Sequence, residues 1–118
     1  MIIGIGTDIV EVERIRESIE RWGDDFLKRI FCEEEIAYAQ KHTDPYQHYA
    51  ARFAAKEAVF KALGDRAFVN WKAIKIVNDA NGKPVCHFLE HEFDGNVLIS
   101  LSHTKHYAVA NAIITKKT

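Results

Sequence analysis

The chain has 118 residues, of which 47% are hydrophobic and 28% are charged, and its formal net charge is -1. This length predicts a single domain over residues 1–118, and the near-zero charge gives no general attraction to nucleic acid. No stretch approaches the ~20 apolar residues of a membrane-spanning helix, and the apolar start at residues 1–3 lacks the basic region and cleavage site of a signal peptide.

The first element is predicted to be a strand over residues 2–12, rich in isoleucine and valine. Side chains alternate along a strand, so Asp8 shares a face with Gly4 and Gly6, where the missing side chains leave spare room. An acid inside an apolar strand is costly to bury without a partner. Asp8 is therefore either a turn or helix-capping acid near the end of the strand, or a ligand for a bound group.

Helices are predicted next, because apolar residues recur at spacings of three and four. The first ends at Gly23, and a short helix follows over residues 25–30. The third begins after Cys32, which is a poor N-terminal cap, so its start is expected to be less secure. The two cysteines, Cys32 and Cys86, match no metal or redox spacing, and their scarcity favours the reducing cytoplasm.

The longest helix is predicted over residues 46–63. Pro45 suits its first turn, and Gly64 suits its end. A stripe of small side chains along one side predicts close packing against another element, and it consists of Ala51, Ala55, Ala58 and Ala62.

This helix carries two separate polar edges. Arg52 and Lys56 form one edge, which is expected to face water. Glu57 and Lys61 lie roughly 100 to 180° away, in a stripe shared with aromatic residues such as Phe53. The second pair is either an ordinary surface pair, worth about 0.2–0.5 kcal/mol, or part of a cleft or an interface.

The second half of the chain is predicted to be mostly strand, with turns at residues 79–82 and 94–96 and a frayed tail from residue 116. The predicted strands cover residues 71–77, 84–89, 97–102 and 107–114. A strand, a block of helices and an antiparallel meander together predict one α+β domain.

Asp8 and Glu57 come from different elements, and together they can hold a hard cation. Magnesium typically takes one or two protein carboxylates, with water and substrate phosphate completing its shell. Lys61, one turn beyond Glu57, can then neutralise phosphate charge. Residues 102–104 are either a polar strand end or an anion contact, and residues 81–84 are primarily a turn, with a ligand contact as the lesser option.

Four blocks along nearly the whole chain resemble the holo-acyl-carrier-protein synthases, in the order of that family. They are Gly4–Ile15, Phe53–Ala58 followed by Lys61–Gly64, Asn81–Pro84, and Ser100–Thr104 followed by Tyr107–Ala110. The resemblance implies a 4′-phosphopantetheinyl transferase fold with a ferredoxin-like sheet, in a homotrimer with active sites between subunits. It implies a magnesium-dependent transferase that moves 4′-phosphopantetheine from coenzyme A to a serine of apo acyl carrier protein, for fatty acid biosynthesis.

The resemblance also implies roles for individual residues. Asp8 and Glu57 would hold magnesium and, with Lys61, would be the catalytic residues. Contacts to the coenzyme A nucleotide would come from Arg52, Lys61, Gly64, Asn81, Gly82, Pro84, Ser102, His103 and Thr104. The acidic helix of the carrier protein would dock on Arg14, Ser18, Arg21 and Phe53. Ser18 replaces a larger apolar residue of the family, a change expected to weaken carrier contact or to alter carrier preference.

In the implied reaction, a serine hydroxyl attacks the β-phosphorus of coenzyme A, and Glu57, itself or through a metal-bound water, is the base. The products would be holo carrier protein and adenosine 3′,5′-bisphosphate. Two alternatives stay open from the residues alone: a magnesium-dependent nucleotide phosphohydrolase, and an oligomeric nucleotide-binding module without catalysis. The placement of Glu57 and Lys61 away from the water-facing edge argues against the second.

Overall fold

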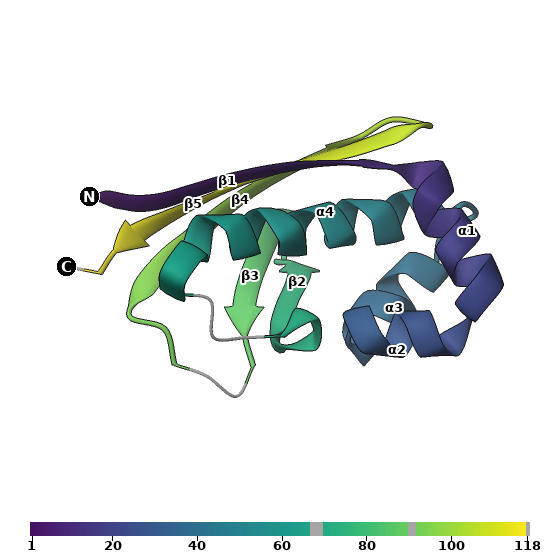
Figure 1. Cartoon of the computed structure of the whole chain (residues 1–118), viewed down its shortest axis with the longest axis horizontal. Coiled ribbons are helices and arrows are strands. Elements are labelled where there is room, and N and C mark those ends of the chain that lie inside the picture. The colour runs from purple at the N-terminus through teal and green to yellow at the C-terminus, as the bar shows by residue number, and fades with distance from the viewer. Residues whose placement is uncertain (67–69, 90–91, 118) are drawn as a thin grey trace.

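The computed structural model describes residues 1–66, 70–89 and 92–117. One strand is followed by a block of helices and then by two hairpins, which confirms the predicted α+β class (Figure 1). The strands are β1 (Ile2–Glu11), β2 (Ile74–Asn78), β3 (Pro84–Phe88), β4 (Gly95–His103) and β5 (Tyr107–Lys116). The helices are α1 (Val12–Trp22), α2 (Asp24–Ile30), α3 (Glu33–Gln40) and α4 (Pro45–Leu63). None of the helices in the described ranges is both long enough and apolar enough to cross a membrane.

The strands form two antiparallel sheets, one in the order β1-β5-β4 and one made of the hairpin β2-β3. β5 is the central strand, so β1 and β4 are the two edges of the larger sheet. Helix α4 lies along the inner face of this sheet, with β2 and β3 on its other side and α1, α2 and α3 gathered at one end (Figure 1). The long central helix α4 therefore packs against the larger sheet, against β2 and against helices α1 and α3.

Glycines in β1 let α4 lie directly on the strand. A methyl group added to Gly6 would overlap the carbonyl oxygen of Ala58, and one added to Gly4 would overlap that of Ala62. Ala58 is fully buried and Ala62 nearly so, as the predicted small-residue stripe requires. The spare room expected beside Asp8 is therefore absent, because the helix backbone occupies it.

Several predicted boundaries shift in the structure. Residues 71–73 form a single 3₁₀ turn instead of the start of a strand, because Asn70 accepts the backbone N–H of Ala73 and caps that turn. β4 begins at Gly95, inside the predicted turn. Lys116 is not frayed, since it ends β5 and its N–H donates to the carbonyl of Met1.

The prediction that Arg52 and Lys56 face water is wrong. Arg52 is 5% exposed and Lys56 is fully buried, because α3 and β2 cover this side of α4. The Nζ of Lys56 lies 2.7 Å from Oε1 of Glu35, which is also fully buried. Nζ donates in addition to the carbonyls of Ile30 and Trp71. The edge formed by Arg52 and Lys56 therefore lies inside the fold, where Lys56 belongs to a buried ion pair.

The same glutamate secures the start of α3, which was predicted to be weak. Oε1 of Glu35 accepts the backbone N–H of Cys32 at 2.9 Å, and Oε2 accepts that of Ile76 at 2.8 Å. This is the capping-box contact, in which a glutamate at the third helical position accepts the backbone N–H of the N-cap residue. Glu35 thus joins α3 to β2 as well as to α4.

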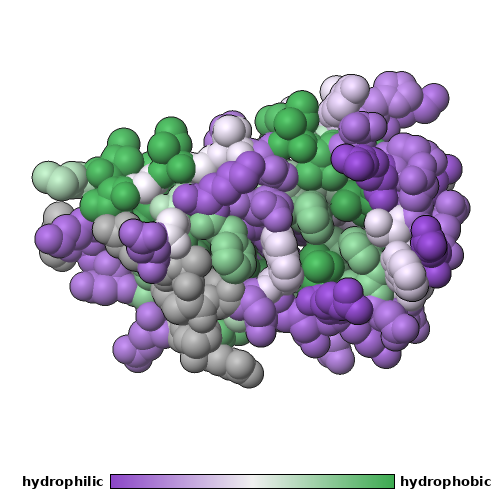
Figure 2. Space-filling model, viewed as in Figure 1, coloured by the Kyte–Doolittle hydropathy of each residue, from purple (hydrophilic) through white to green (hydrophobic). Residues whose placement is uncertain are grey.

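The outer face of the three-stranded sheet is bare and carries several exposed apolar side chains. Ile5 and Ile9 of β1 are 72% and 64% exposed, and none of the described elements covers them. Leu98 of β4 and Tyr107 of β5 extend the same surface. Figure 2 shows hydrophobic residues along the rim of the molecule that carries this sheet. Exposed apolar patches of this kind are typical of surfaces that bind another protein chain.

Candidate active site

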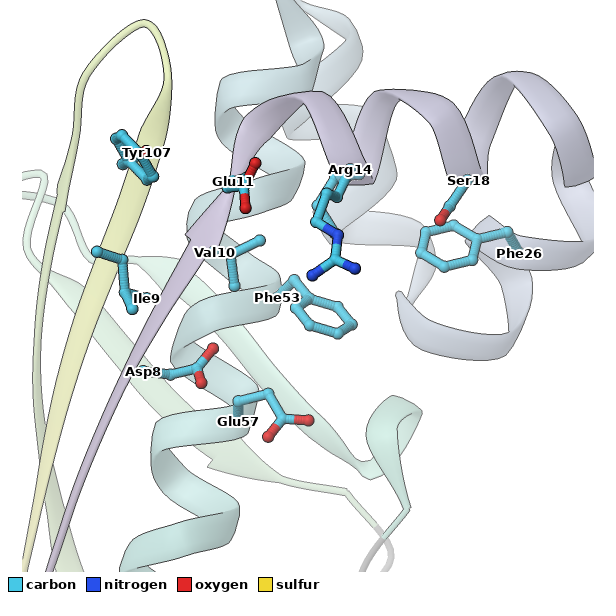
Figure 3. A pocket seen from close by; sticks show the side chains of 11 residues that line it. Asp8, Ile9, Val10, Glu11, Arg14, Ser18, Phe26, Phe53, Glu57 and Tyr107 are labelled. Carbon is cyan, nitrogen blue, oxygen red and sulfur yellow. The ribbon is translucent and has the colours of Figure 1, made fainter.

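Two carboxylates and an amine meet where β1 crosses α4. Asp8 projects from the strand and Glu57 from the helix into the same opening (Figure 3). Lys61, one turn further along α4, donates from Nζ to Oδ1 of Asp8 and to the carbonyl of Thr7, each at 3.1 Å. The side chain of Asp8 is 14% exposed and that of Lys61 is 53% exposed, so the group lies at the rim of the protein, open to a ligand.

The group carries two carboxylates, Asp8 and Glu57, but one ammonium group, that of Lys61. The pKa of Glu57 is raised, first because the side chain is partly buried and second because Asp8 is close by, while Lys61 acts in the opposite direction. Two neighbouring carboxylates disfavour each other's ionised form, and a cation between them relieves that cost. Among the described residues no third histidine, cysteine or acid joins them to complete a metal site. The donor set therefore fits a hard cation that takes its other ligands from water and substrate.

A cavity of about 430 Å³ runs from these acids along α1. Arg14 and Ser18 of α1 and Phe53 of α4 line it, as do Phe26 of α2 and Tyr107 of β5 (Figure 3). Three of the four residues predicted to dock a carrier protein thus share one cavity with the predicted catalytic acids. The fourth, Arg21, is not among the residues that line this cavity and stacks instead on Trp22, with its guanidinium 5.0 Å from the ring centre.

Sequence reasoning missed Phe26 and Tyr107 as part of this cavity. Phe26 was only one apolar residue of a short helix, and Tyr107 was the first residue of a strand. Neither position carries a pattern that separates a cavity wall from a core residue, and only the packing of α2 against α1 brings Phe26 there.

Other residues predicted to contact a nucleotide lie on a different side of the fold. His103 is at the end of β4, the edge strand opposite β1, and its Nδ1 lies 3.0 Å from Oε1 of Gln47. Thr104 follows it, and the Thr104 hydroxyl accepts the backbone N–H of Tyr107. Ser102 is exposed on β4, next to Val109 of β5 in the ladder.

Arg52 and the β2–β3 turn also belong to this second group. Nη2 of Arg52 donates to Oδ1 of Asn78, the last residue of β2. In the turn, Asn81 and Gly82 sit at the tip and Pro84 begins β3, while Asp79 accepts the N–H of Asn81. Gly82 has φ 82°, a conformation that glycine adopts without strain.

Gly64 differs from both groups. It ends α4 with φ 55°, one residue beyond the last helical residue and three beyond Lys61. It therefore lies on the same helix as the acid site, at its far end.

Within one chain, the predicted site residues thus form two groups. Asp8 and Glu57 lie at the β1 edge of the larger sheet, and His103 lies at its β4 edge, with β5 between them.

Comparisons with known proteins support one family. A sequence model of the 4′-phosphopantetheinyl transferase superfamily matches residues 4–112. The chain is 45% identical over 115 residues to the holo-[acyl-carrier-protein] synthase of Thermodesulfovibrio yellowstonii, covering 98% of this chain and 100% of the relative. It is also 45% identical over 119 residues to that of Protochlamydia amoebophila, covering 96% and 98%.

Solved structures agree with the sequence relatives. A crystal structure of a holo-(acyl-carrier-protein) synthase from Bacillus anthracis in complex with CoA (3′,5′-ADP) matches with a TM-score of 0.85 and 34% identity, over 99% of both chains. The synthase from Neisseria meningitidis matches with a TM-score of 0.86 and 36% identity, over 98% of this chain and 100% of the other. The similarity therefore extends over both sheets and the helical block.

Proposed function

The chain belongs to the 4′-phosphopantetheinyl transferase superfamily, and we propose from this membership that it is a holo-[acyl-carrier-protein] synthase. It transfers the 4′-phosphopantetheine group from coenzyme A to a serine of apo acyl carrier protein, and adenosine 3′,5′-bisphosphate is the second product. The observation that carries the proposal is Asp8, Glu57 and Lys61 meeting at the mouth of a cavity, in a chain alike over its whole length to synthases of this name.

Magnesium is proposed as the cofactor, held by Asp8 and Glu57. The raised pKa of Glu57, caused by burial and by the neighbouring charge of Asp8, supports a cation between the two acids. When bound, magnesium would polarise the phosphoryl oxygens and stabilise the leaving phosphate. Two protein carboxylates leave most of its shell to water and to the coenzyme A phosphates, as is usual for this ion.

The side chains of the chain itself supply the rest of the chemistry. Glu57, itself or through a metal-bound water, is the proposed base that accepts the proton of the attacking serine hydroxyl. Lys61 is proposed to balance the negative charge that builds up on the phosphate. Asp8 holds the Lys61 amine at the acid site through the 3.1 Å contact.

The cavity beyond the acids is the proposed path of the pantetheine arm and the docking side for the carrier protein. Arg14 and Ser18 line it on α1, and Phe53 lines it on α4. Arg14 offers a positive charge to an acidic carrier helix, whereas Ser18 offers little apolar contact. Arg21, further along α1, would meet the same helix outside the cavity.

We further propose that the enzyme works as a homotrimer with its active sites between subunits. The bare outer face of the three-stranded sheet gives each subunit a surface to bury, including Ile5 and Ile9. The division of the predicted site residues between the β1 and β4 edges supports a site shared by two chains. Modification of the acyl carrier protein would place the enzyme in fatty acid biosynthesis, in the cytoplasm.

The test is the intact mass of apo acyl carrier protein after incubation with the protein, coenzyme A and magnesium. The carrier protein is expected to gain the mass of one phosphopantetheine group. This gain should not occur when magnesium is removed by a chelator. Glu57→Gln and Asp8→Asn should each lower the rate on the order of 10²–10³-fold and leave the fold intact, the loss typical of one electrostatic group. The matched control is Glu33→Gln, which removes an exposed charge of α3. This variant should transfer phosphopantetheine at the normal rate.

Three results would count against the proposal. Hydrolysis of coenzyme A without a carrier protein would favour a phosphohydrolase, and binding of coenzyme A without any transfer would favour a non-catalytic module. Full activity of either acid variant at low magnesium would refute the metal assignment.

A further inference from the structure

Arg52 is a buried cation, and the buried carboxylate of Glu35 acts on it only at longer range, because Glu35 is paired directly with Lys56. Arg52 is 5% exposed, and no carboxylate in the described part of the chain lies within ion-pair distance of it. Its Nε is sealed from solvent without a hydrogen-bond partner. Burying a charged group in this way is costly unless something pairs with it. An arginine in this state keeps donors free for an anion that enters from outside.

Two side chains hold the guanidinium in place. Oδ1 of Asn78 accepts a hydrogen bond from Nη2 of Arg52 at 3.1 Å, and the ring of Tyr38 lies under the guanidinium, 4.4 Å from its central carbon. Asn78 in turn donates from Nδ2 to the hydroxyl of Tyr38 at 3.3 Å. The three groups form a closed triangle, so that Arg52 is fixed on one face and on one edge.

This triangle opens on a cavity of about 300 Å³ between α3, α4 and β2. Lys41 lies on its wall as a second cation, and Glu34 is the acid of that wall. Glu34 is engaged by Lys75, so its charge is already balanced and it does not offset Arg52. The cavity therefore presents more positive than negative charge.

The triangle also connects the second group of predicted site residues. Asn78 faces Pro84 across the β2–β3 ladder and directly precedes the turn at residues 79–82. The edge of the Tyr38 ring meets His48, whose ring centre lies 5.3 Å from that of His103. Tyr38 and Asn78 are therefore the links that join Arg52 to His103 on one side and to the turn on the other.

We propose that Tyr38 and Asn78 are positioning residues that hold Arg52 ready for a phosphate group of the coenzyme A nucleotide. This inference rests on the proposed function, in which Arg52 contacts that nucleotide. The neutral amide of Asn78 is the essential feature, because it orients the guanidinium without neutralising it. The guanidinium of Arg52 therefore remains available to bind a phosphate, and its planar arrangement of donors makes that binding geometrically specific.

The decisive variant is Asn78→Asp, which keeps the shape of the side chain but gives Arg52 a carboxylate partner. The Michaelis constant for coenzyme A and the dissociation constant for adenosine 3′,5′-bisphosphate are each expected to rise on the order of 10- to 100-fold, the change that follows when a charge-assisted contact is lost. The turnover number and the Michaelis constant for the carrier protein should change little. The melting temperature should be equal to or above that of the wild-type protein, since a buried arginine gains a partner.

A purely structural role for Asn78 predicts the opposite pattern, with the melting temperature affected and the Michaelis constant for coenzyme A unchanged. Tyr38→Phe is the second variant, because it keeps the ring under Arg52 and removes only the hydroxyl that receives Asn78. Its Michaelis constant for coenzyme A should rise about 2- to 10-fold, the value of one neutral hydrogen bond. It also tests the inference should Asn78→Asp fail to fold.

The two proposals fail in different ways. If the wild-type protein neither transfers phosphopantetheine nor binds adenosine 3′,5′-bisphosphate in calorimetry, both are wrong. If the wild-type protein does both, and Asn78→Asp and Tyr38→Phe bind the nucleotide with the wild-type constant, then the positioning role is wrong and the transferase stands.

Discussion

Replacing Lys56 by methionine is expected to lower the free energy of unfolding by about 3–5 kcal/mol, the range for removing one member of a buried ion pair. Methionine has a similar length, so the change removes charge and hydrogen bonds more than volume. The carboxylate of Glu35 would be left fully buried without its cation, 2.7 Å from where Nζ had been. The carbonyls of Ile30 and Trp71 would lose their donor as well, which places the expected loss toward the upper end.

The chain offers a matched control one residue away from Glu35. Lys75 pairs with Glu34, the preceding residue of α3, but the Glu34 side chain is 64% exposed. Lys75→Met should therefore cost only about 0–1 kcal/mol, because water replaces the lost partner. Urea unfolding followed by circular dichroism, at one fixed protein concentration, measures both variants.

A double variant checks the physical reason. Lys56→Met combined with Glu35→Gln removes both charges and keeps an amide oxygen for the backbone N–H of Ile76. It should be more stable than Lys56→Met alone, since an uncompensated buried charge costs more than the loss of a whole pair. Equal losses for Lys56→Met and Lys75→Met, or no recovery in the double variant, would refute the reasoning.

Two further predictions concern pH. Burial and the neighbouring histidines lower the pKa of His48 from 6.5 to about 4, so the unfolded chain takes up the proton first as pH falls. The contribution of neutral His48 to the free energy of unfolding is therefore complete above pH 6.5 and is lost as pH falls from 6.5 to 4. After solvent screening this contribution is roughly 1 kcal/mol. Urea midpoints of His48→Phe should be less sensitive to pH in this window, and parallel curves would rule this out. In magnesium-free protein, Asp8→Asn should lower the pKa of Glu57 in a carbon-13 NMR titration, because the repelling charge is gone while burial stays. An unchanged pKa would mean that the two carboxylates do not interact.

Much of the fold could be predicted from local patterns. Glycine and proline marked the ends of the helices, and Gly23, Pro45 and Gly64 occupy the predicted places. The alanine stripe predicted close packing, and the contact of Ala58 with Gly6 is of that kind. Such features depend on residues that are close together in the chain, so a single sequence is enough to predict them.

Contacts between distant segments could not be predicted in the same way. Arg52 and Lys56 have the spacing of a solvated edge, and only the placement of α3 and β2 buries them. Glu35 is the last of three consecutive acids at the start of α3, and its partner is 21 positions away in the sequence. Helical periodicity reports which residues share a side, but not which neighbour covers that side.

The acid site illustrates the same limit. Asp8 and Glu57 were selected because each was out of place in its own element, and they project into one opening in the structure. Tyr38 and Asn78 were not selected, because a tyrosine on a helix and an asparagine before a turn are ordinary. Their importance appears only in their contacts with Arg52.

The central position of β5 has a consequence for the order in which the chain can fold. Among the described strands, β1 pairs only with β5, so Thr7 cannot pair until Asn111 has been synthesised. β4 also pairs with β5 and therefore lacks a partner until β5 has been made. During synthesis, α4 is complete long before the sheet that covers its alanine stripe exists. At that point β1 is the one strand of this sheet that has been made, and its glycines are the residues that pack on Ala58 and Ala62. The three-stranded ladder can therefore be completed only after the final strand has been made, because both of its pairings use β5.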